Sequence, residues 1–530
     1  MRSACLDQPV EIRLRHSFLE YLEASDLRSA GHFPKMRQPM RQGMQSQSIR
    51  SRVALAVSCV AFTFVYVITA TSFRNSFLLD PDTFLHISVG KLILQTGHFP
   101  IADQFSYTAF GKAWFATDWI SELIFAVLYG ASRWLGVTEI VAVTGALISG
   151  VLCFYLATKL RLSIAFGLTV VIIALISPHF LARPVILSYL LLSVWTILVL
   201  ETDDRNTWAE WQGFVFIPLM MLWANVHGSF TFGLVVFYLF MGNAIWDTCI
   251  KRDLGRLRRL LVLLCGVTIA AMVTPYGPFA TLKTVKLMSD PALATIDEWR
   301  APDFQHDPFH LAGIVGLFAL VTYFGVRVRG PRLLTLLLVT VFALEHKRGL
   351  GLFALVAPLV LIRPLSDCVP WIRVQDQVLD PVIRFFSRRS ATVALTCTLI
   401  VAITGIVMWT VGPRIQPPAE RIPENAIAAA KRAGIKGNVL NSHGFGGYLI
   451  FEGIPPFVDG RVELYGNEFL RRYFDAMKLV DPDDAARILK QYDIRWALLQ
   501  PNEPIAFMLK ADGWVQIYND QSAIVLARRT

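Results

Sequence analysis

The sequence is short of charged residues for its length. Only 17% of its 530 residues are Asp, Glu, Lys or Arg, whereas 54% are hydrophobic, and the mean hydropathy is +0.49. Soluble proteins carry about 25% charged residues, so this composition excludes a soluble protein of this size. The sequence predicts a polytopic α-helical membrane protein.

Cysteine is also scarce, and it is absent from the segments that we expect outside the membrane. Of the seven cysteines, four fall inside apolar runs and three on segments that we assign to the cytoplasm. Neither a disulfide nor a thiolate metal site is therefore expected. The sequence also lacks a convincing internal repeat, which many transporters have, and it lacks a G-x-G-x-x-G phosphate-binding pattern.

The basic residues give a formal net charge of +10, but they do not indicate nucleic acid as a partner. They gather in short segments beside apolar runs, at 251–259, 327–332 and 363–389. Such segments mark the cytoplasmic side of a membrane protein. The first apolar run, 53–73, is too long for a cleaved signal peptide. We interpret it as an uncleaved anchor and the basic tail 1–52 as a disordered cytoplasmic segment.

Twelve apolar runs lie between residues 53 and 411. If all the basic segments are cytoplasmic, the number of crossings between them is consistent only when the run 119–134 does not cross the membrane. That run is short and carries charge, which suits a helix on the membrane surface. This arrangement predicts about eleven transmembrane helices, a cytoplasmic N-terminus and an external loop over 74–118. The composition then changes, and 413–530 is predicted to form an extracytoplasmic α/β domain.

The external loop begins with two carboxylates at the point where the chain leaves the bilayer. Asp80-Pro81 is typical of the N-cap and first position of a helix, which we expect to run to about Thr96. Asp82 and His86 then share one helical face. Asp80 and Asp82 are the catalytic candidates. The plain alternative is a capped surface helix whose acids only favour the N-terminal dipole.

The same topology carries other polar residues to the external face. Ionisable groups at the ends of spans are costly and mark sites, although a side chain that extends to the interface is the ordinary alternative. Glu298 and Arg300 lie in a loop, where charges are usually solvated. The candidate substrate-binding residues are His86, Arg183, Asn225, His227, Glu345, His346, Lys347 and Arg348.

These features resemble GT-C glycosyltransferases, which combine an acidic loop after the first span, surface helices and a C-terminal external domain. Asp80-Pro81 with 96–103 resembles the first external loop of oligosaccharyltransferase catalytic subunits and protein mannosyltransferase-like proteins. The segment 439–448, followed by 458–460, resembles the Trp-Trp-Asp-Tyr-Gly region of oligosaccharyltransferases, but Ser442, His443 and Gly444 depart from it. Asp-Pro-Asp, Trp-x-Asn-x-His-Gly and Asp-Gly-Arg together also resemble a group of bacterial membrane proteins.

The resemblance implies an inverting enzyme of the bacterial inner membrane. It would transfer a hexosyl or pentosyl group from a polyprenyl-phosphate-linked donor to a cell-envelope glycan, lipid or protein on the periplasmic side. Asp80 or Asp82 would act as base or hold a divalent cation, Mg or Mn, and Arg183, Lys347 and Arg348 would neutralise the departing phosphate. Two alternatives stay open: a transporter or flippase of a polyprenyl-linked or other anionic lipid, and a non-catalytic assembly partner.

Overall fold

The structure is a computed structural model that describes residues 37–73, 75–287, 293, 296–373, 381–412, 415–419 and 421–529, with side chains from residue 50 onward except at 381 and 382. It divides into two compact units, Met1–Arg52 and Val53–Thr530. The tail predicted to be disordered lies outside the described residues as far as residue 36, and a helix begins at Arg37.

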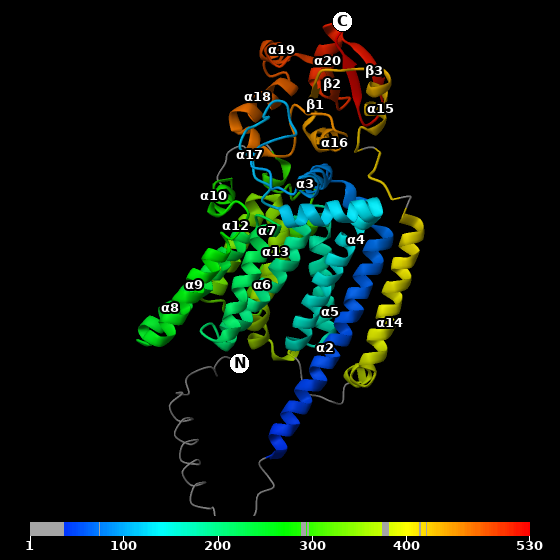
Figure 1. Ribbon diagram of the computed structural model, residues 1–530. Helices are drawn as coiled ribbons and strands as arrows, with labels where there is room; N and C mark the ends of the chain where they lie inside the picture. Colours follow the sequence, from blue (N-terminus) through cyan, green and yellow to red (C-terminus); the bar gives the residue numbers. More distant parts are fainter. Residues whose placement is uncertain are drawn as a thin grey trace, which may run out of the picture. The chain divides into compact units, whose positions relative to one another are not determined.

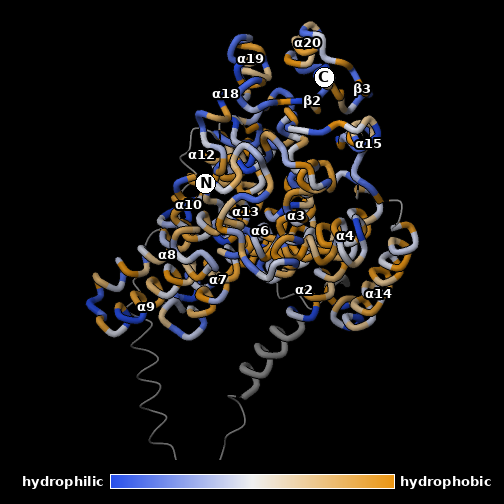
Figure 2. The backbone as a smooth tube through the Cα atoms, turned by 45° about the horizontal axis from the view of Figure 1, so that its top comes forward, coloured by the Kyte–Doolittle hydropathy of each residue, from blue (hydrophilic) through white to orange (hydrophobic). Residues whose placement is uncertain are grey.

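The second unit contains a bundle of apolar helices followed by a small α/β domain (Figure 1). Hydrophobic residues concentrate in the bundle, whereas the C-terminal segments mix hydrophobic and hydrophilic residues (Figure 2). The bundle helices are the part of α2 (Arg37–Ser72) from Val53 onward, α4 (Trp119–Lys159), α5 (Leu162–Ile176), α6 (Val185–Arg205), α7 (Phe216–Val226), α8 (Phe230–Ile250), α9 (Leu254–Ala270), α11 (Pro308–Tyr323), α12 (Pro331–Glu345), α13 (Lys347–Cys368) and α14 (Pro381–Val411).

Seven helices among the described residues are long and apolar enough to cross a membrane, so the protein is a multi-pass membrane protein. The other bundle helices are shorter, with 11 residues in α7, 17 in α9, 16 in α11 and 15 in α12. A perpendicular crossing takes about 20 residues. The eleven crossings expected from the sequence would need all four shorter helices to cross, and that number stays a prediction.

Helix α4 joins the predicted surface segment to the span that follows it. Its backbone leaves the helical region at Ser132, with φ −146°, and at Arg133, with φ 55°. A positive φ is uncommon for a residue other than glycine and marks a change of chain direction. The first arm of α4 is therefore separated by a kink from the part that enters the bundle, as a surface helix at 119–134 requires.

Helix α3 (Asp82–Thr96) packs beside the first arm of α4. The helix begins one residue later than predicted, with Pro81 rather than Asp80 at the N-cap position. The Asp80 carboxylate still accepts a hydrogen bond from the Asp82 backbone N–H at 2.8 Å. Gly90 faces α4, and a Cβ at this position would lie 2.1 Å from the Glu122 carbonyl oxygen. The two helices approach so closely only because residue 90 has no side chain.

The C-terminal domain is built on a sheet of four strands in the order β1-β2-β4-β3. The β1–β2 pair is parallel, and β4 pairs antiparallel with both β2 and β3. The central strand β2 is buried at all but one of its positions. The elements are α15 (Glu424–Arg432), β1 (Asn438–Asn441), α16 (Gly446–Phe451), α17 (Val462–Tyr465), α18 (Asn467–Met477), α19 (Pro482–Gln491), β2 (Ile494–Leu499), α20 (Pro504–Ala511), β3 (Val515–Asn519) and β4 (Ile524–Ala527).

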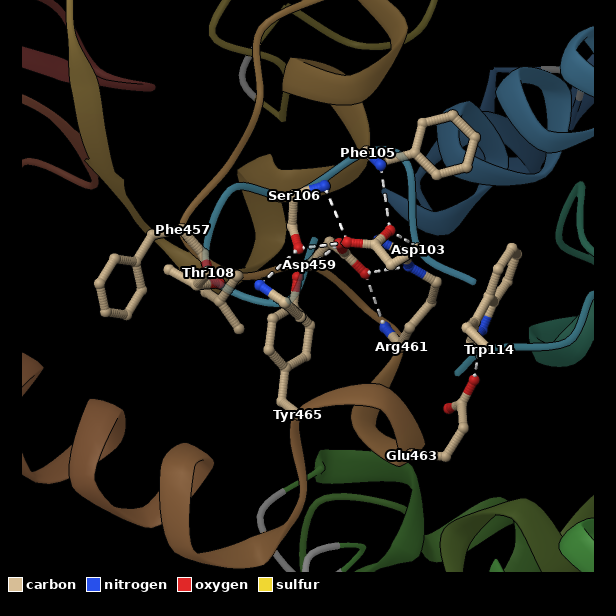
Figure 3. Close-up of polar contacts among 12 residues, drawn as sticks. Asp103, Phe105, Ser106, Thr108, Trp114, Phe457, Asp459, Arg461, Glu463 and Tyr465 are labelled. Atoms are coloured by element: carbon tan, nitrogen blue, oxygen red, sulfur yellow. Dashed lines mark hydrogen bonds and ion pairs between the residues drawn. The ribbon is translucent and has the colours of Figure 1, made fainter. Parts of the chain in front are cut away.

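A buried ion cluster fastens this domain to the loop between α3 and α4 (Figure 3). Arg461 donates to Asp459 through Nε at 2.8 Å and Nη2 at 2.7 Å, and to Asp103 through Nη1 at 2.7 Å. The Tyr465 hydroxyl donates to Asp459 at 2.7 Å, and the Ser106 hydroxyl donates to Asp103 at 2.6 Å. We call Arg461, Asp459 and Asp103 the Arg461 cluster; it holds the loop and the domain together.

Candidate functional site

A second arginine, Arg183, lies in the loop that joins α5 to α6, and its guanidinium is placed between two carboxylates from other segments. Its guanidinium donates to Glu298 twice, from Nη1 to Oε1 at 2.5 Å and from Nη2 to Oε2 at 2.8 Å, and Nη1 also contacts Asp80 Oδ2. Burial alone would raise the pKa of Glu298, but Arg183 and, after it, Arg348 hold this pKa below its ordinary value. Arg183, Asp80 and Glu298 form the Arg183 cluster, a charge-assisted contact that includes a bidentate pair.

Backbone hydrogen bonds bring Arg183 to Asp80. The Ala182 N–H donates to the Phe77 carbonyl oxygen at 2.8 Å, and the Thr83 hydroxyl donates to the Ala182 carbonyl oxygen at 2.9 Å. Both backbone groups of residue 182 are thus bound to the segment that precedes or begins α3. The loop between α5 and α6 is thereby fixed against the start of the acidic motif.

His346 and Lys347, at the start of α13, fix the segment that carries Glu298. This segment is a single 3₁₀ turn, η5 (Asp297–Trp299). The His346 Nδ1–H donates to a carbonyl oxygen of η5 at 2.7 Å, and Lys347 Nζ lies 2.7 Å from an Asp297 carboxylate oxygen. Both residues are predicted to bind substrate. In the structure they are occupied in positioning η5.

Asp82 lies directly beneath the C-terminal domain. A Cβ on Gly460 would stand 2.1 Å from Asp82 Oδ1, so the turn that carries Arg461 passes immediately over this carboxylate. Burial and, next, the charge of Asp80 raise the pKa of Asp82 to about 6, against the opposing charge of Arg183. Among the described residues no donor hydrogen-bonds the Asp82 carboxylate, which leaves it available to a substrate.

One turn later on α3, His86 faces the start of α4. His86 Nδ1 lies 3.3 Å from Glu122 Oε1, and Glu122 Oε2 is buried without a hydrogen-bond partner among the described residues. Burial alone would lower the pKa of His86, but its bond to Glu122 and the charge there raise it. Burial and the charge of Glu122 raise the pKa of Asp118 to about 7. Glu122 and Asp118 therefore lie around His86, which is itself one helical turn from Asp82.

Asn225 ties the end of α7 to its neighbours. Its side-chain oxygen accepts from Trp119 Nε1 at 2.7 Å, and its side-chain nitrogen donates to the Val273 carbonyl oxygen at 2.8 Å. The Ser121 hydroxyl also donates to the Val226 carbonyl oxygen at 2.7 Å. Asn225, predicted to bind substrate, is placed by these contacts as an anchor between α7 and α4.

His227 and Arg348 meet on the other side of the site. Arg348 Nη2 lies 3.0 Å from His227 Nε2, and since a guanidinium only donates, Nε2 must accept. On its other side, His227 Nδ1 lies 2.9 Å from the Ser229 hydroxyl and 3.1 Å from the Ser229 backbone nitrogen. Burial and the charge of Arg348 lower the pKa of His227 well below its ordinary value, so this imidazole is neutral.

Arg348 keeps its positive charge without a direct ion-pair partner in the described residues, and this charge acts only at longer range on Glu298 and Asp118. Its contacts are the neutral His227 ring and the face of the Trp299 ring, whose centroid lies 5.7 Å from the guanidinium carbon. In the described part of the chain no carboxylate lies within ion-pair distance of it. This is a suitable arrangement for an incoming anion.

The structure brings most of the predicted residues to one end of the bundle. Glu345 is different, because its side chain is exposed at the end of α12 and has no hydrogen-bond or ion-pair partner among the described residues. Two residues of the site were not selected from the sequence, Glu298 and Gly460. Those that the structure gathers are Asp80, Asp82, His86, Arg183, Asn225, His227, His346, Lys347 and Arg348.

The carboxylates of the site do not form a metal site as they are arranged. Within the described residues, no group of three or more His, Cys, Asp or Glu side chains is placed to hold a metal ion. Asp80, predicted with Asp82 to be a ligand of Mg or Mn, accepts the Asp82 N–H on Oδ1 and contacts Arg183 through Oδ2. Donors thus already occupy the Asp80 oxygens that a cation would need.

The fold and the site together define a class: a multi-pass helical membrane protein with a C-terminal α/β domain placed over a buried polar site. Within this class, the chain is similar to the solved structure of the archaeal oligosaccharyltransferase AglB from Archaeoglobus fulgidus, in complex with an inhibitory peptide and a dolichol-phosphate. The TM-score is 0.51 at 12% sequence identity, over 84% of this chain and 69% of that chain. No protein-family model and no curated protein sequence matches the chain.

Proposed function

We propose that the protein is a membrane glycosyltransferase, which moves a glycosyl group from a polyprenyl-phosphate-linked donor to an extracytoplasmic acceptor. One observation carries the proposal: ionisable groups from distant chain segments converge at one end of an apolar bundle with a GT-C-like fold. The AglB structure contains a dolichol-phosphate and a peptide, and we extend the lipid-phosphate class of ligand to this chain. We place it in a bacterial inner membrane, with the C-terminal domain in the periplasm.

In this proposal Asp82 is the general base. It takes the proton of an acceptor hydroxyl while the hydroxyl oxygen forms a bond to the anomeric carbon. The bond from that carbon to the phosphate oxygen breaks, and its electron pair leaves with the phosphate, which inverts the anomeric configuration. Asp82 suits this role better than Asp80, whose two oxygens are engaged. A pKa of about 6 leaves Asp82 ionised at neutral pH yet still basic.

Arg348 is the group that we assign to the departing phosphate. A guanidinium binds two phosphate oxygens at once, and the partners of Arg348 in the structure are neutral. Lys347 is less suitable, because its ammonium group already pairs with Asp297. The donor would therefore approach with its phosphate toward Arg348 and its sugar toward Asp82.

The acceptor must reach Asp82 beside Gly460, so the C-terminal domain forms part of its binding surface. The Asp459-Gly460-Arg461 turn is held in place by the Arg461 cluster. An acceptor that contacts this turn meets backbone groups at Gly460 rather than a side chain. The domain is thus proposed to restrict which acceptors fit above the base.

The test is reconstitution of the purified protein in liposomes that contain lipid-linked glycans from a strain in which this gene is deleted. We expect the donor to be consumed and polyprenyl phosphate to be released. Asp82→Asn should lower this rate by about 100-fold or more, the usual contribution of a general base. Asp483→Asn, which changes an exposed acid in α19, is the matched control and should react normally.

The other functions give different results in the same experiment. Movement of unchanged donor between leaflets would support a flippase and contradict the proposal. Neither consumption nor movement of any lipid-linked glycan, together with tight binding of a partner by the C-terminal domain, would support an assembly role. Full activity of Asp82→Asn in a preparation that does consume donor would remove the base from Asp82 while leaving the transferase in place.

A further inference from the structure

We infer that the Arg183 guanidinium is a built-in cation that takes the place of a divalent metal ion between Asp80 and Glu298, so that this site works without one. The inference concerns the proposed active site, and its catalytic part rests on the proposed transfer reaction. Its structural part, the exclusion of a metal ion by a side chain, is independent of the substrate.

The hydrogen-bond donors of Arg183 match the carboxylate oxygens of Asp80 and Glu298. Two carboxylates from segments far apart in the sequence, Asp80 and Glu298, point at one centre, which is the arrangement expected around a hard cation. Arg183 occupies that centre with two parallel hydrogen bonds to Glu298 and a contact to Asp80. A planar guanidinium satisfies this geometry without the further oxygen ligands that Mg or Mn requires.

Arg183 is also held in place and cannot easily give way. Ala182, the residue before it, is bound through both its N–H and its carbonyl oxygen. Glu298 is fixed from its own side, because Lys347 and His346 hold η5. A metal ion would have to displace a charged side chain from a pre-formed pair, and this leaves the guanidinium without a carboxylate in a largely buried place.

Within the described part of the chain, Asp80 and Glu298 also lack further side chains beside them that would complete the ligands of a metal ion. Asp82, the other predicted ligand, presents its Oδ1 to the Gly460 turn rather than joining Asp80 and Glu298 around a common centre. In the described residues no third acidic, imidazole or thiol side chain completes a group that could hold a metal ion. With Arg183 in place, the described residues therefore offer Mg or Mn at most two carboxylates here, and both are already paired with the guanidinium.

A fixed guanidinium at this point has two consequences for the proposed reaction. Its positive charge opposes the effects of burial and of Asp80 on Asp82, and so helps to keep the base ionised. It also keeps Asp80 from competing for the acceptor proton. Arg183 is thus a positioning residue for Asp82, whereas Arg348 remains the group that contacts the leaving phosphate.

The structural part is tested by Mn²⁺ binding, followed by electron paramagnetic resonance of the purified full-length protein. We expect the wild type to bind no Mn²⁺ at this site. Arg183→Met, which leaves Asp80 and Glu298 facing an empty centre, should gain one Mn²⁺ site. Lys347→Met removes a cation from the neighbouring ion pair and should gain none. Saturable binding by the wild type that Asp80→Asn abolishes would overturn the inference.

The catalytic part is tested by donor consumption in the presence of EDTA. The wild-type rate should be unchanged by EDTA, and Arg183→Met should lose about 100-fold, the effect of removing a pre-organised charged donor. Added Mg²⁺ or Mn²⁺ should restore part of the rate of Arg183→Met but leave the wild type unaffected. Inhibition of the wild type by EDTA with recovery on adding Mg²⁺ would overturn the inference, whereas absence of transfer in every condition would overturn only the proposed function.

Discussion

Two arginines in this protein each lie between two carboxylates, but their surroundings differ. In the Arg461 cluster the side chains are sealed: Arg461 is 4% exposed and both Asp103 and Asp459 are 0% exposed. The rings of Trp114 and Phe105 cover the guanidinium, with centroids 4.7 and 5.3 Å from its central carbon. In the Arg183 cluster, Arg183 is 14% exposed and Glu298 is 36% exposed.

The hydrogen bonds around the two clusters differ in the same direction. Hydroxyl groups of Tyr465 and Ser106 donate to the acids of the Arg461 cluster, so each carboxylate has a hydroxyl donor in addition to Arg461. Around Arg183, only the Asp82 N–H adds a donor in the described residues. The same combination of residues is thus a structural fastening in one place and, beside Asp82 and open on one side, part of a proposed active site in the other.

The largest difference between the two clusters should appear in stability. Arg461→Met leaves two fully buried carboxylates without their cation, and loss of one partner of a buried pair costs about 3–5 kcal/mol. Arg183→Met should destabilise the protein by less than half of this, because water reaches Glu298. The measurement is thermal unfolding of both variants in the same detergent. Equal destabilisation would show that the distinction between a sealed and an open cluster is wrong.

The contact between Gly460, in the turn next to Arg461, and Asp82, beside the Arg183 cluster, can be tested by substitution of Gly460. A methyl group at this position would overlap with Asp82 Oδ1, so Gly460→Ala should displace the base and lower transfer by about tenfold or more, since small misplacements of reacting groups are costly. Gly444→Ala is the matched control, because a Cβ there meets no atom within 4 Å. The two variants should behave alike only if the turn does not control Asp82.

Asp82, beside the Arg183 cluster, and Asp459, in the Arg461 cluster, should also respond differently to pH. Burial and Asp80 raise the pKa of Asp82 to about 6, so transfer should fall by about tenfold per pH unit below that value as the base becomes protonated. Burial alone would raise the pKa of Asp459, but Arg461 holds it below its ordinary value. The stabilisation from Asp459 is therefore present above its unfolded-state pKa of about 4 and lost only at lower pH. Rate and unfolding profiles between pH 5 and 7 should consequently separate, and parallel profiles would contradict this.

The smallest effect is expected at Lys347. Its pair with Asp297 is substantially exposed, with Asp297 at 73%, and exposed pairs contribute at most about 1 kcal/mol. Lys347→Met should change the transfer rate by less than about fivefold, through a looser η5. A loss as large as that of Arg348→Met would show that Lys347 contacts the phosphate directly.

Much of the membrane architecture could be predicted from sequence, because apolar length and the distribution of basic residues are local properties. The helix that follows Asp80-Pro81 and the gathering of Arg183, His227 and Arg348 with the acidic loop also follow from local patterns and topology, although the helix starts one residue later than predicted. What could not be predicted is pairing. Whether a polar residue binds a ligand or anchors a helix depends on its partners. The side chain of Asn225, for example, already hydrogen-bonds to groups on α4 and on the loop that follows α9.

Two further features illustrate the same limit. Glu298 carries only the signal of a charge in a loop, and its importance comes from α13, which holds η5 beside Arg183. At the start of helix α16, a Cβ on Gly447 would stand 2.6 Å from the Pro81 carbonyl oxygen. Gly447 thus provides room for the start of the neighbouring α3, which no local pattern reveals.

The close approach of Gly460 to Asp82 has a consequence for engineering this protein. Reactivity is divided between two halves of the chain that are encoded far apart, so neither half can be exchanged with that of a relative without retuning the other. A membrane bundle without the C-terminal domain, even if it folds, would retain the Asp82 carboxylate but lose the Gly460 turn, which limits how an acceptor hydroxyl can approach it. Chimeras should therefore keep residues 80–86 and 459–461 from the same parent.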